Sequence, residues 1–391
     1  MIDYFEKRLG ISEFPDTFDK IYSNACAEYE KSGVFFLEDG YIRALNEKTS
    51  ALLRTENEVI RAATAARSNE AAAKYALFVY LAMEDRELFM AHLSLFSFPA
   101  DHPFLAFLCL LPSVDALFDG LMQKGFDREI VLATVRQYED CLFLGLERTG
   151  IFGLGKRYFD HLQCYVDQKI FNIKRLRFEK KTLKDVFLLR NRSTKEYMLF
   201  LDGKKINSAG LIEGTPPIAD GESFDAFFSE TETEYIGTAV NSRGRCKKDP
   251  IALKKSEWEL KLRPGDICLA VHIPAGGALT EEAVRESYDC AYSVFREHFP
   301  EIAVKGFYCH SWMLAPELES ILKPESNLLS FQKPYIKYPC PTRGEDVMTF
   351  VFGQKPKNYA DLPEGTSLQR ALKKIYLSGD YLYEYCGIIP I

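Results

Sequence analysis

Residues 264–312 read PGDICLAVHIPAGGALTEEAVRESYDCAYSVFREHFPEIAVKGFYCHSW and predict a strand, a helix and a second strand in succession. The apolar runs Ile267–Ile273 and Val304–Tyr308 are typical of buried strands. Between them, apolar side chains recur every three or four residues from Thr280 to His298, which predicts a helix with one buried face. Two strands joined through a helix are expected to be parallel, with a right-handed crossover.

The chain is long enough for two domains, because single hydrophobic cores stop growing at about 250–300 residues and this chain has 391. Helical patterns dominate as far as residue 165, so we expect residues 1–165 to form an all-helical domain of about seven to nine helices. Its clearest helices are predicted over Glu47–Arg67, Asn69–Met83 and Asp127–Glu147.

Strand-type segments follow in residues 166–391, and Asp202-Gly203 predicts a hairpin turn between Met198–Leu201 and Ile206. These strands are predicted over Asp185–Arg190, Glu196–Leu201, Glu234–Val240 and Glu257–Leu262. Residues 214–221 read as a loop. The expected fold class is α + α/β: an all-helical N-terminal domain followed by a mixed β-sheet domain flanked by helices.

Charge and composition exclude several classes of protein. The formal net charge is −7, and the first 160 residues hold 25 of the 56 acidic side chains but only 17 of the 49 basic ones. A nucleic-acid-binding surface needs a basic footprint, so we expect no nucleic-acid partner. No apolar run approaches the ~20 residues that cross a bilayer, and the acidic N-terminus lacks the order of a signal peptide. We therefore expect a cytoplasmic protein with no membrane partner.

The ten cysteines are spread along the chain, and no two of them form a C-x-x-C pair. A structural zinc site needs ligands clustered a few residues apart. Cysteines within apolar stretches usually act as small buried hydrophobes. We therefore expect neither a metal site nor a disulfide framework.

The loop Pro274-Ala275-Gly276-Gly277-Ala278 joins the first strand to the helix and is the strongest candidate for a ligand site. Its glycines allow close backbone approach, and Thr280 is a natural N-cap for the helix. The free N–H groups and partial positive charge of a helix N-terminus can hold a phosphate. Glu281 and Glu282 in the first turn would compete with such an anion. The same residues therefore also fit a plain tight turn, in which the glutamates balance the helix dipole.

A basic stretch runs from Lys169 to Arg192. We interpret it as a solvated linker and protected strand edge, in preference to a phosphate-binding patch. Its basic residues include Lys174, Arg175, Arg177, Lys180, Lys181 and Lys184.

The quartet Cys309-His310-Ser311-Trp312 ends the second strand, where ligands of open α/β sheets usually bind. Neighbouring residues of a strand point to opposite faces, so His310 cannot serve Cys309. His272, at the end of the neighbouring strand, is the obvious alternative, and the pair Cys309 and His272 would make a thiol enzyme. In the alternative interpretation Cys309 is simply buried and Trp312 packs in the core.

Several short motifs over residues 265–332 occur together: Gly265-Asp266, His272-Ile273-Pro274, Gly276-Gly277, Ser287 and Ala291, Phe299-Pro300-Glu301, Cys309-x-Ser311-Trp312, Pro316, Ser326-Asn327 and Phe331-Gln332. As a set they resemble a bacterial acyltransferase-like family with a helical N-terminal domain and a GNAT-like C-terminal domain. The resemblance covers about the last 220 residues by motif and the helical part by character only.

The resemblance implies that the strand Ile267–Ile273 pairs with the pantetheine arm of acyl-CoA or acetyl-CoA, the acyl donor. The loop and the helix N-terminus would hold the pyrophosphate. The second strand would diverge and leave a cleft in which an amine of a small molecule attacks the thioester, with His272 as base and Cys309 or Ser311 lining the cleft. The implied cofactor-binding residues are Val271, Ile273, Ala275, Gly276, Gly277, Ala278, Thr280 and Asn327.

The sequence departs from the common GNAT pattern at two points. The usual Gln/Arg-x-x-Gly-x-Gly/Ala phosphate loop is absent, and the predicted helix Pro316–Leu322 lacks the tyrosine that commonly protonates the leaving thiolate. Beyond it, Pro324–Gln332 predicts a turn that leads into a strand, with Asn327 ordering the turn. Two functions stay open: a GNAT-like N-acyltransferase, and a non-catalytic GNAT-like ligand-binding module that has lost the CoA phosphate loop.

Overall fold

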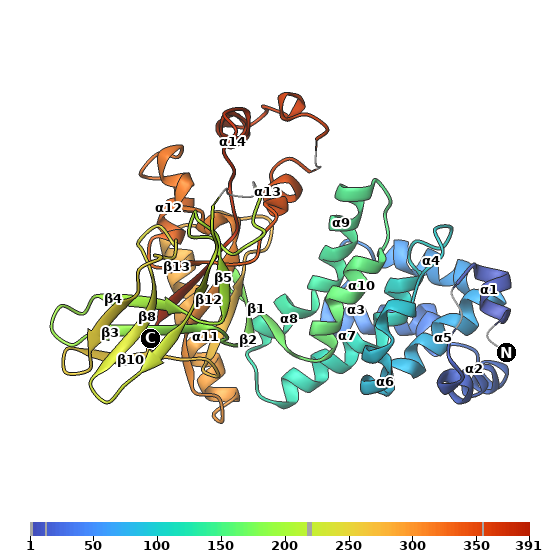
Figure 1. Ribbon diagram of the computed structural model, residues 1–391. Helices are drawn as coiled ribbons and strands as arrows, with labels where there is room; N and C mark the ends of the chain where they lie inside the picture. Colours follow the sequence, from blue (N-terminus) through green and yellow to red (C-terminus); the bar gives the residue numbers. More distant parts are fainter. Residues whose placement is uncertain (1–2, 12–13, 217–220, 354–355) are drawn as a thin grey trace. The chain divides into compact units, whose positions relative to one another are not determined.

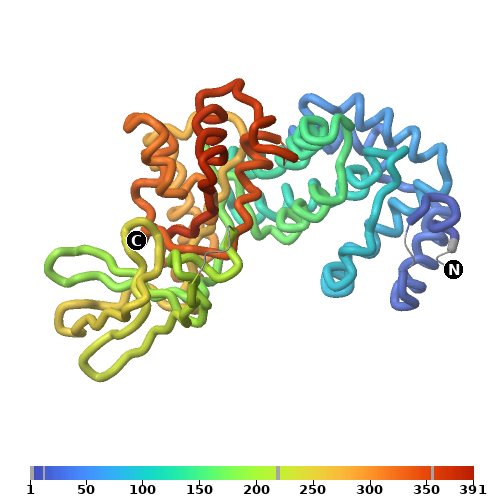
Figure 2. The backbone as a smooth tube through the Cα atoms, turned by 45° about the horizontal axis from the view of Figure 1, so that its top comes forward, coloured from blue at the N-terminus to red at the C-terminus, as the bar shows by residue number. Residues whose placement is uncertain are grey.

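The computed structural model describes residues 3–11, 14–216, 221–353 and 356–391. The chain divides into two compact units, Met1–Asn172 and Ile173–Ile391. Figure 1 shows the first as an assembly of helices and the second as strands flanked by helices, and Figure 2 traces the chain through both. The predicted α + α/β class is confirmed. The boundary predicted at 165/166 lies just before the end of the last helix of the first unit.

Ten α-helices form the helical unit in the part of the chain that the structure describes. Helices α5 and α7 lie at its centre, where most of their side chains are buried. By length and composition α7 could cross a membrane, but most of its apolar window is buried inside the unit, as in the core helix of a globular protein. The helices are α1 (Asp3–Leu9), α2 (Asp19–Ser32), α3 (Asp39–Thr49), α4 (Glu56–Arg67), α5 (Glu70–Glu84), α6 (Arg86–Ala91), α7 (Leu105–Gln123), α8 (Arg128–Val135), α9 (Gln137–Thr149) and α10 (Lys156–Val166).

The prediction of seven to nine helices was too low, because two predicted helices are each split. Residues 47–67 divide at Ser50, which takes a left-handed conformation (φ 51°) and ends α3. Residues 127–147 divide at Arg136, which separates α8 from α9. Periodicity alone did not reveal the second break, because apolar residues keep their helical spacing across Arg136.

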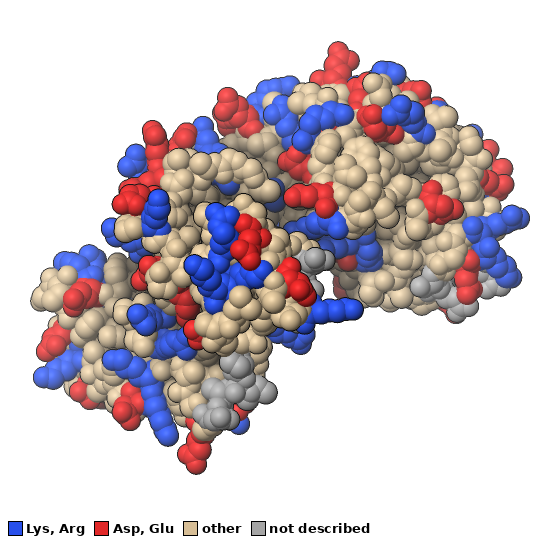
Figure 3. Space-filling model, turned by 90° about the horizontal axis from the view of Figure 1, so that it is seen from above, with Lys and Arg blue, Asp and Glu red and all other residues tan. Residues whose placement is uncertain are grey.

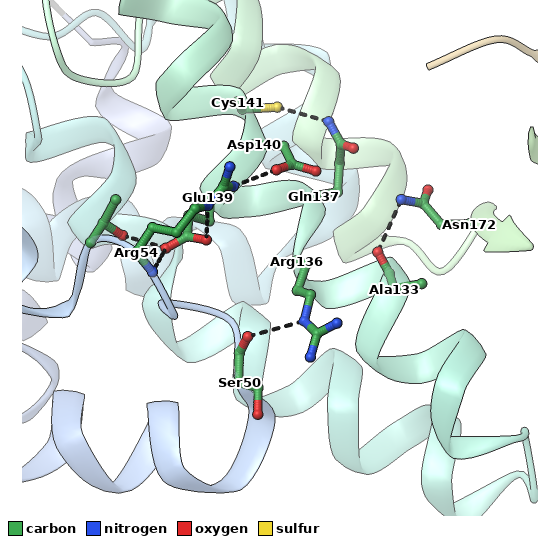
Figure 4. A network of polar contacts seen from close by, with 10 residues as sticks. Ser50, Arg54, Ala133, Arg136, Gln137, Glu139, Asp140, Cys141 and Asn172 are labelled. Atoms are coloured by element: carbon green, nitrogen blue, oxygen red, sulfur yellow. Dashed lines mark hydrogen bonds and ion pairs between the residues drawn. The ribbon is translucent and has the colours of Figure 1, made fainter. Parts of the chain in front are cut away.

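A buried carboxylate fixes the loop between α3 and α4 (Figure 4). The Glu139 side chain is only 2% exposed, and it accepts hydrogen bonds from the Arg54 backbone N–H (2.7 Å), Arg54 Nε (2.9 Å) and Thr55 Oγ1 (2.9 Å). A buried charge is stable only when it is paired and hydrogen-bonded. Glu139 on α9 therefore holds the break after Ser50 in place.

The second unit contains two sheets and a short strand pair. The first sheet has the order β1-β2-β11-β12-β14-β13; the second has the order β10-β3-β4-β8-β7, with β9 paired to β8; β5 pairs with β6. The strands are β1 (Ile170–Ile173), β2 (Leu176–Thr182), β3 (Val186–Asn191), β4 (Tyr197–Leu201), β5 (Lys204–Ile206), β6 (Phe224–Ala226), β7 (Phe228–Glu230), β8 (Glu234–Val240), β9 (Ile251–Lys254), β10 (Trp258–Leu262), β11 (Ile267–His272), β12 (Val304–Ser311), β13 (Ile336–Pro339) and β14 (Tyr385–Pro390).

The strand–helix–strand unit predicted from the sequence is confirmed. Strands β11 and β12 are parallel and are connected by α11 (Glu281–His298). The Thr280 side chain caps α11 by accepting a hydrogen bond from the Ala283 backbone N–H at 3.3 Å. The remaining helices of this unit are α12 (Asn327–Gln332), α13 (Glu345–Phe350) and α14 (Ser367–Leu377).

Three local predictions need correction. Asp202-Gly203 does not make a hairpin, because β5 leaves the sheet of β4 and pairs with β6. Residues 324–332 form no strand; the Ser326 side chain accepts from the Leu328 N–H and starts helix α12. The helix predicted over Pro316–Leu322 is a shorter 3-10 helix, Pro316–Ser320. The predicted loop 214–221 lies partly outside the described residues.

Both faces of the first sheet are covered. On one face, Tyr288 of α11 packs on Phe178 and Phe307, with ring centroids 6.2 and 4.5 Å apart. On the other, Cys268 and Cys386 join a core cluster with residues of the second sheet, among them Val186, Leu188 and Leu199. Side chains of β11 therefore alternate between the α11 face and the second-sheet face, which positions the candidate site described next.

Candidate functional site

Strands β11 and β12 separate beyond Ala270. Their register pairs are Ile267–Val304, Leu269–Phe307 and Ala270–Tyr308, and the pairs end there although both strands continue. On its other side β11 stays paired with β2 as far as His272. Beyond Ala270, the backbone of β11 therefore has an edge that faces away from β2 and is not paired with β12. Unpaired backbone N–H and C=O groups are available to hydrogen-bond an amide-containing ligand.

The loop that follows this open edge is shaped by two glycines in left-handed conformations. Gly276 has φ 78° and Gly277 has φ 63°, a region that side chains rarely adopt. Arg175, in the turn before β2, donates hydrogen bonds to the Pro274 carbonyl (3.1 Å) and the Gly277 carbonyl (3.0 Å). The loop is thus pinned at both ends by one guanidinium. Ala275, Gly276, Gly277 and Ala278 are exposed.

Arg175 also contacts the helix that begins after the loop. Its backbone N–H donates to Ser287 Oγ on α11 at 3.0 Å, and that hydroxyl donates to the Ala283 carbonyl at 2.7 Å. The turn before β2, the glycine loop and the first turns of α11 therefore form one hydrogen-bonded unit. Ser287 is fully buried.

Two neighbouring guanidinium groups give this unit a positive charge. Partial burial and then the like charge of Arg177 lower the pKa of Arg175. Among the described residues, the Nε atoms of both Arg175 and Arg177 are buried without a hydrogen-bond partner. A bound anion would reduce the repulsion between the two charges and could complete their hydrogen bonding. The basic stretch that we interpreted as solvated thus contributes Arg175 to the structure of the loop.

The N-terminus of α11 combines favourable and unfavourable groups for an anion. Thr280 uses its side chain as the cap, and Leu279 and Val284 on either side of the helix start are buried. Glu281 and Glu282 occupy the first turn and are exposed to solvent. Solvent screens their charges, so they weaken the anion site less than buried carboxylates would.

His272 lies at the open end of β11 and contacts a carboxylate. Its Nε2 is 3.1 Å from Glu179 Oε2, and the two side chains are 45% and 32% exposed. When Nε2 carries the proton and donates it to Glu179, Nδ1 has a free lone pair. A histidine oriented by a carboxylate in this way is suited to accept a proton.

The structure does not bring Cys309 and His272 together. Leu269 and Phe307 are register partners that face α11; Cys309 lies two residues after Phe307 on that same face. His272 lies three residues after Leu269 and therefore faces the other way. Burial raises the pKa of the Cys309 thiol well above its usual value, so it stays protonated near neutral pH. The thiol-enzyme interpretation is not supported by this geometry.

The other predicted site residues have local structural contacts. Ser311 Oγ accepts a hydrogen bond from the Met313 N–H at 3.1 Å and caps the 3-10 helix Trp312–Leu314. Asn327 is exposed at the start of α12, a helix that packs against α11. Val271 is buried and Ile273 half-buried at the end of β11. No group of His, Cys, Asp or Glu side chains suited to a metal ion occurs within the described ranges.

Sequence reasoning missed Arg175, Arg177 and Glu179 as site residues. A signal was present, because these polar residues alternate with the apolar Leu176 and Phe178, as in a strand with one polar face. That alternation could have predicted β2. It could not have predicted that β2 pairs with β11, a segment about 90 residues further along the chain.

A family model described as GNAT-like C-terminal domain matches residues 170–389. No curated protein matches the sequence.

Several solved structures share the fold over nearly the full length. A crystal structure of an acyltransferase mutant in complex with octanoyl-CoA has 16% identity and a TM-score of 0.65, and the match covers 100% of both chains. An acyltransferase in complex with decanoyl-CoA has 14% identity and a TM-score of 0.64, covering 100% of this chain and 99% of that one. A third, in complex with CoA and 10C-teicoplanin, has 16% identity and a TM-score of 0.64, covering 99% and 98%.

Proposed function

The chain belongs to the family defined by the GNAT-like C-terminal domain, and from this premise we propose that it is an acyl-CoA-dependent N-acyltransferase. It transfers an acyl group from the thioester to an amine of a small molecule. The observation that carries the proposal is the arrangement at the end of β11. An open strand edge, a two-glycine loop held by Arg175 and the N-terminus of α11 follow one another within residues 271–281.

This arrangement suits the parts of a CoA ester. The pantetheine arm carries two amides, which can pair with the free backbone edge of Val271 and Ile273 in the manner of an added strand. The pyrophosphate fits the N–H groups of the glycine loop and of α11, beside Arg175 and Arg177. The structural neighbours were solved with octanoyl-CoA and decanoyl-CoA, so medium-chain donors are the first to test.

The chemistry requires positioning and one proton transfer. The amine nitrogen attacks the thioester carbonyl carbon, and a backbone N–H at the open edge of β11 can stabilise the oxyanion. His272 Nδ1 accepts the proton of the amine, while Glu179 balances the charge on the imidazolium. The C–S bond breaks and CoA leaves as the thiol once its sulfur is protonated. The products are an amide and free CoA.

The acceptor is proposed to be a small molecule with a free amine. Two of the structural neighbours were solved with 10C-teicoplanin or teicoplanin, so teicoplanin belongs in the acceptor panel. On the face drawn in Figure 3, Lys and Arg are interspersed with Asp and Glu, without the single-sign surface that nucleic acids require. A reducing compartment such as the cytoplasm suits the ten free cysteines.

The test combines ligand-induced stabilisation with turnover. Purified protein is heated with CoA, octanoyl-CoA or decanoyl-CoA, with ATP and NAD as controls; a ligand at 100 times its Kd should add about 2.7 kcal/mol of stability. Acyl transfer is then followed by mass spectrometry over a panel of amines. Arg175→Gln should weaken CoA binding, whereas the matched change Arg263→Gln, on an exposed residue before the other end of β11, should not.

Each outcome separates the two candidate functions. Stabilisation by acyl-CoA together with amide formation supports the transferase. Stabilisation without amide formation would leave the acyl acceptor outside the panel that was tested. No stabilisation by any CoA species would refute the transferase and favour the non-catalytic binding module, which has lost the CoA phosphate loop.

A further inference from the structure

A cavity lies on the face of the first sheet opposite α11. It has a volume of about 190 Å³, and Lys181, Lys184 and Lys204 are among the residues that line it. Lys204 pairs with Asp185 at 2.7 Å, and that carboxylate also lines the cavity. Two cysteines, Cys340 and Cys386, line the same cavity. The cavity is therefore lined by several lysines and by two thiols, on the face of the sheet that α11 does not cover.

The two cysteines are cross-strand neighbours. Cys386 on β14 is the register partner of Tyr338 on β13, and Cys340 follows Tyr338 by two residues. In antiparallel strands such diagonal residues share a face. The Cys340 thiol donates a hydrogen bond to the Glu384 carbonyl, 3.3 Å away on the segment that leads into β14, and Cys340 and Cys386 line the same cavity.

Two tyrosines lie beside Cys386. Tyr308 Oη is 3.0 Å from Cys386 Sγ, and Tyr338 lines the same cavity. Lys181 adds positive charge, with its Nζ 5.7 Å from the centre of the Tyr308 ring. The Cys340 hydrogen bond first, and then the two tyrosines, lower the pKa of Cys386 against the effect of its burial.

Two other cysteines of the same hydrophobic cluster, Cys246 and Cys268, differ from Cys386, because burial raises the pKa of each to about 12. A thiol in that state reacts slowly with electrophiles, because the thiolate is the nucleophile. Cys268 is therefore an internal control for the reactivity of Cys386 in the same protein.

We propose that Cys386 and Cys340 form an oxidisable dithiol, and that the lysine-lined cavity is a modification site for small peroxides. The Cys386 thiolate attacks one peroxide oxygen, the O–O bond breaks, and the departing hydroxide takes up a proton to become water. Cys386 is then a sulfenic acid. The Cys340 sulfur attacks the sulfenic sulfur, its proton leaves with the hydroxyl as a second water, and a disulfide remains. In total, two thiols and one hydrogen peroxide give one disulfide and two waters.

The inference does not depend on the acyl transfer proposed above, because its readout is the chemistry of the thiols. Intact protein is treated with hydrogen peroxide, remaining thiols are blocked with iodoacetamide, and peptides are identified by mass spectrometry. The expected result is a peptide pair linked through Cys340 and Cys386, with Cys268 still alkylated. Cys26 and Cys290 are only half-buried. The proposal would be overturned if Cys386 were still recovered in its alkylated form when these two cysteines had already been oxidised.

Two further measurements separate the roles of the residues. In Cys340→Ser, the sulfenic acid on Cys386 has no resolving thiol, so dimedone should label Cys386; absence of the label would contradict its role as the attacking thiolate. In the wild-type protein, Cys386 should react with iodoacetate about tenfold faster than Cys268. Lys181→Gln should slow the reaction of Cys386 with iodoacetate, because it removes a positive charge near the sulfur. Lys180→Gln should not slow it, because the Lys180 side chain points to the opposite face of β2. Equal effects of the two substitutions would refute the role of Lys181.

Discussion

The glycine loop offers a test, because its two glycines have similar backbone conformations and differ in whether a side chain would contact Arg175. Both have left-handed backbones, so an alanine at either position costs about 1–2 kcal/mol of conformational strain. A Cβ on Gly276 would meet no atom within 4 Å, whereas a Cβ on Gly277 would lie 3.2 Å from Arg175 Nε. Gly276→Ala is therefore a matched control for the strain in Gly277→Ala.

The predicted difference comes from the displaced guanidinium. To relieve a 3.2 Å contact, Arg175 has to shift by a few tenths of an ångström, which lengthens its hydrogen bonds to the carbonyls of Pro274 and Gly277. A hydrogen bond to a charged group contributes about 1.5–3 kcal/mol, and the same guanidinium is proposed to face the pyrophosphate. Loss of about 1.4 kcal/mol is a tenfold change in Kd.

Calorimetric titration with CoA measures this directly. Gly277→Ala should raise the Kd for CoA at least about tenfold more than Gly276→Ala does. Equal Kd values for the two variants would refute the role of Arg175 in holding the loop. If both variants bind CoA as tightly as the wild type, the loop does not contact the phosphates at all.

Three further predictions follow from other parts of the structure. Glu139→Gln should lower the free energy of unfolding by about 2–3 kcal/mol in urea titration, because it removes a buried charge with three hydrogen bonds. Asp140→Asn should lower it by less than about 1 kcal/mol, because the Asp140 side chain is 45% exposed. Equal losses in the two variants would contradict this. His272→Gln and Glu179→Gln should each lower kcat about 10²-fold or less without changing the Kd for CoA, and unchanged turnover in both would exclude His272 as the base. Burial raises the pKa of Cys268 from 9.0 to about 12, so as the pH rises this thiol ionises in the unfolded protein before it ionises in the folded protein. The stability that this thiol contributes is therefore complete below pH 9 and is lost by about 1.4 kcal/mol per pH unit towards pH 12. Cys268→Ala should reduce that slope by one proton in urea titrations at pH 9.5 and 10.5, and an unchanged slope would contradict the raised pKa.

The elements that sequence predicted well are those fixed by local signals. Helix α11 has an amphipathic stripe, an N-cap and a flanking apolar pair, so its start could be placed at Thr280. The apolar runs around it predicted β11 and β12, and their order along the chain predicted parallel pairing. These features depend on residues within one turn or one strand of each other.

The elements that sequence failed to predict depend on distant partners. The loop after Ser50 is held by hydrogen bonds to Glu139, which lies far along the chain. Arg175 was interpreted as solvated because nothing in its neighbourhood shows that it pins residues 274–277. Cys309 and His272 are both near strand ends, but only the register of β11 and β12 shows that they face opposite ways.

Hydrogen–deuterium exchange with and without decanoyl-CoA tests the central claim most directly, because it locates the bound donor on the chain. We predict protection of backbone amides in peptides that cover residues 271–284 and 174–178, with Arg263 and its neighbours unchanged. Protection elsewhere, with exchange in residues 271–284 unaffected, would contradict the assignment of the acyl-CoA site to β11 and α11.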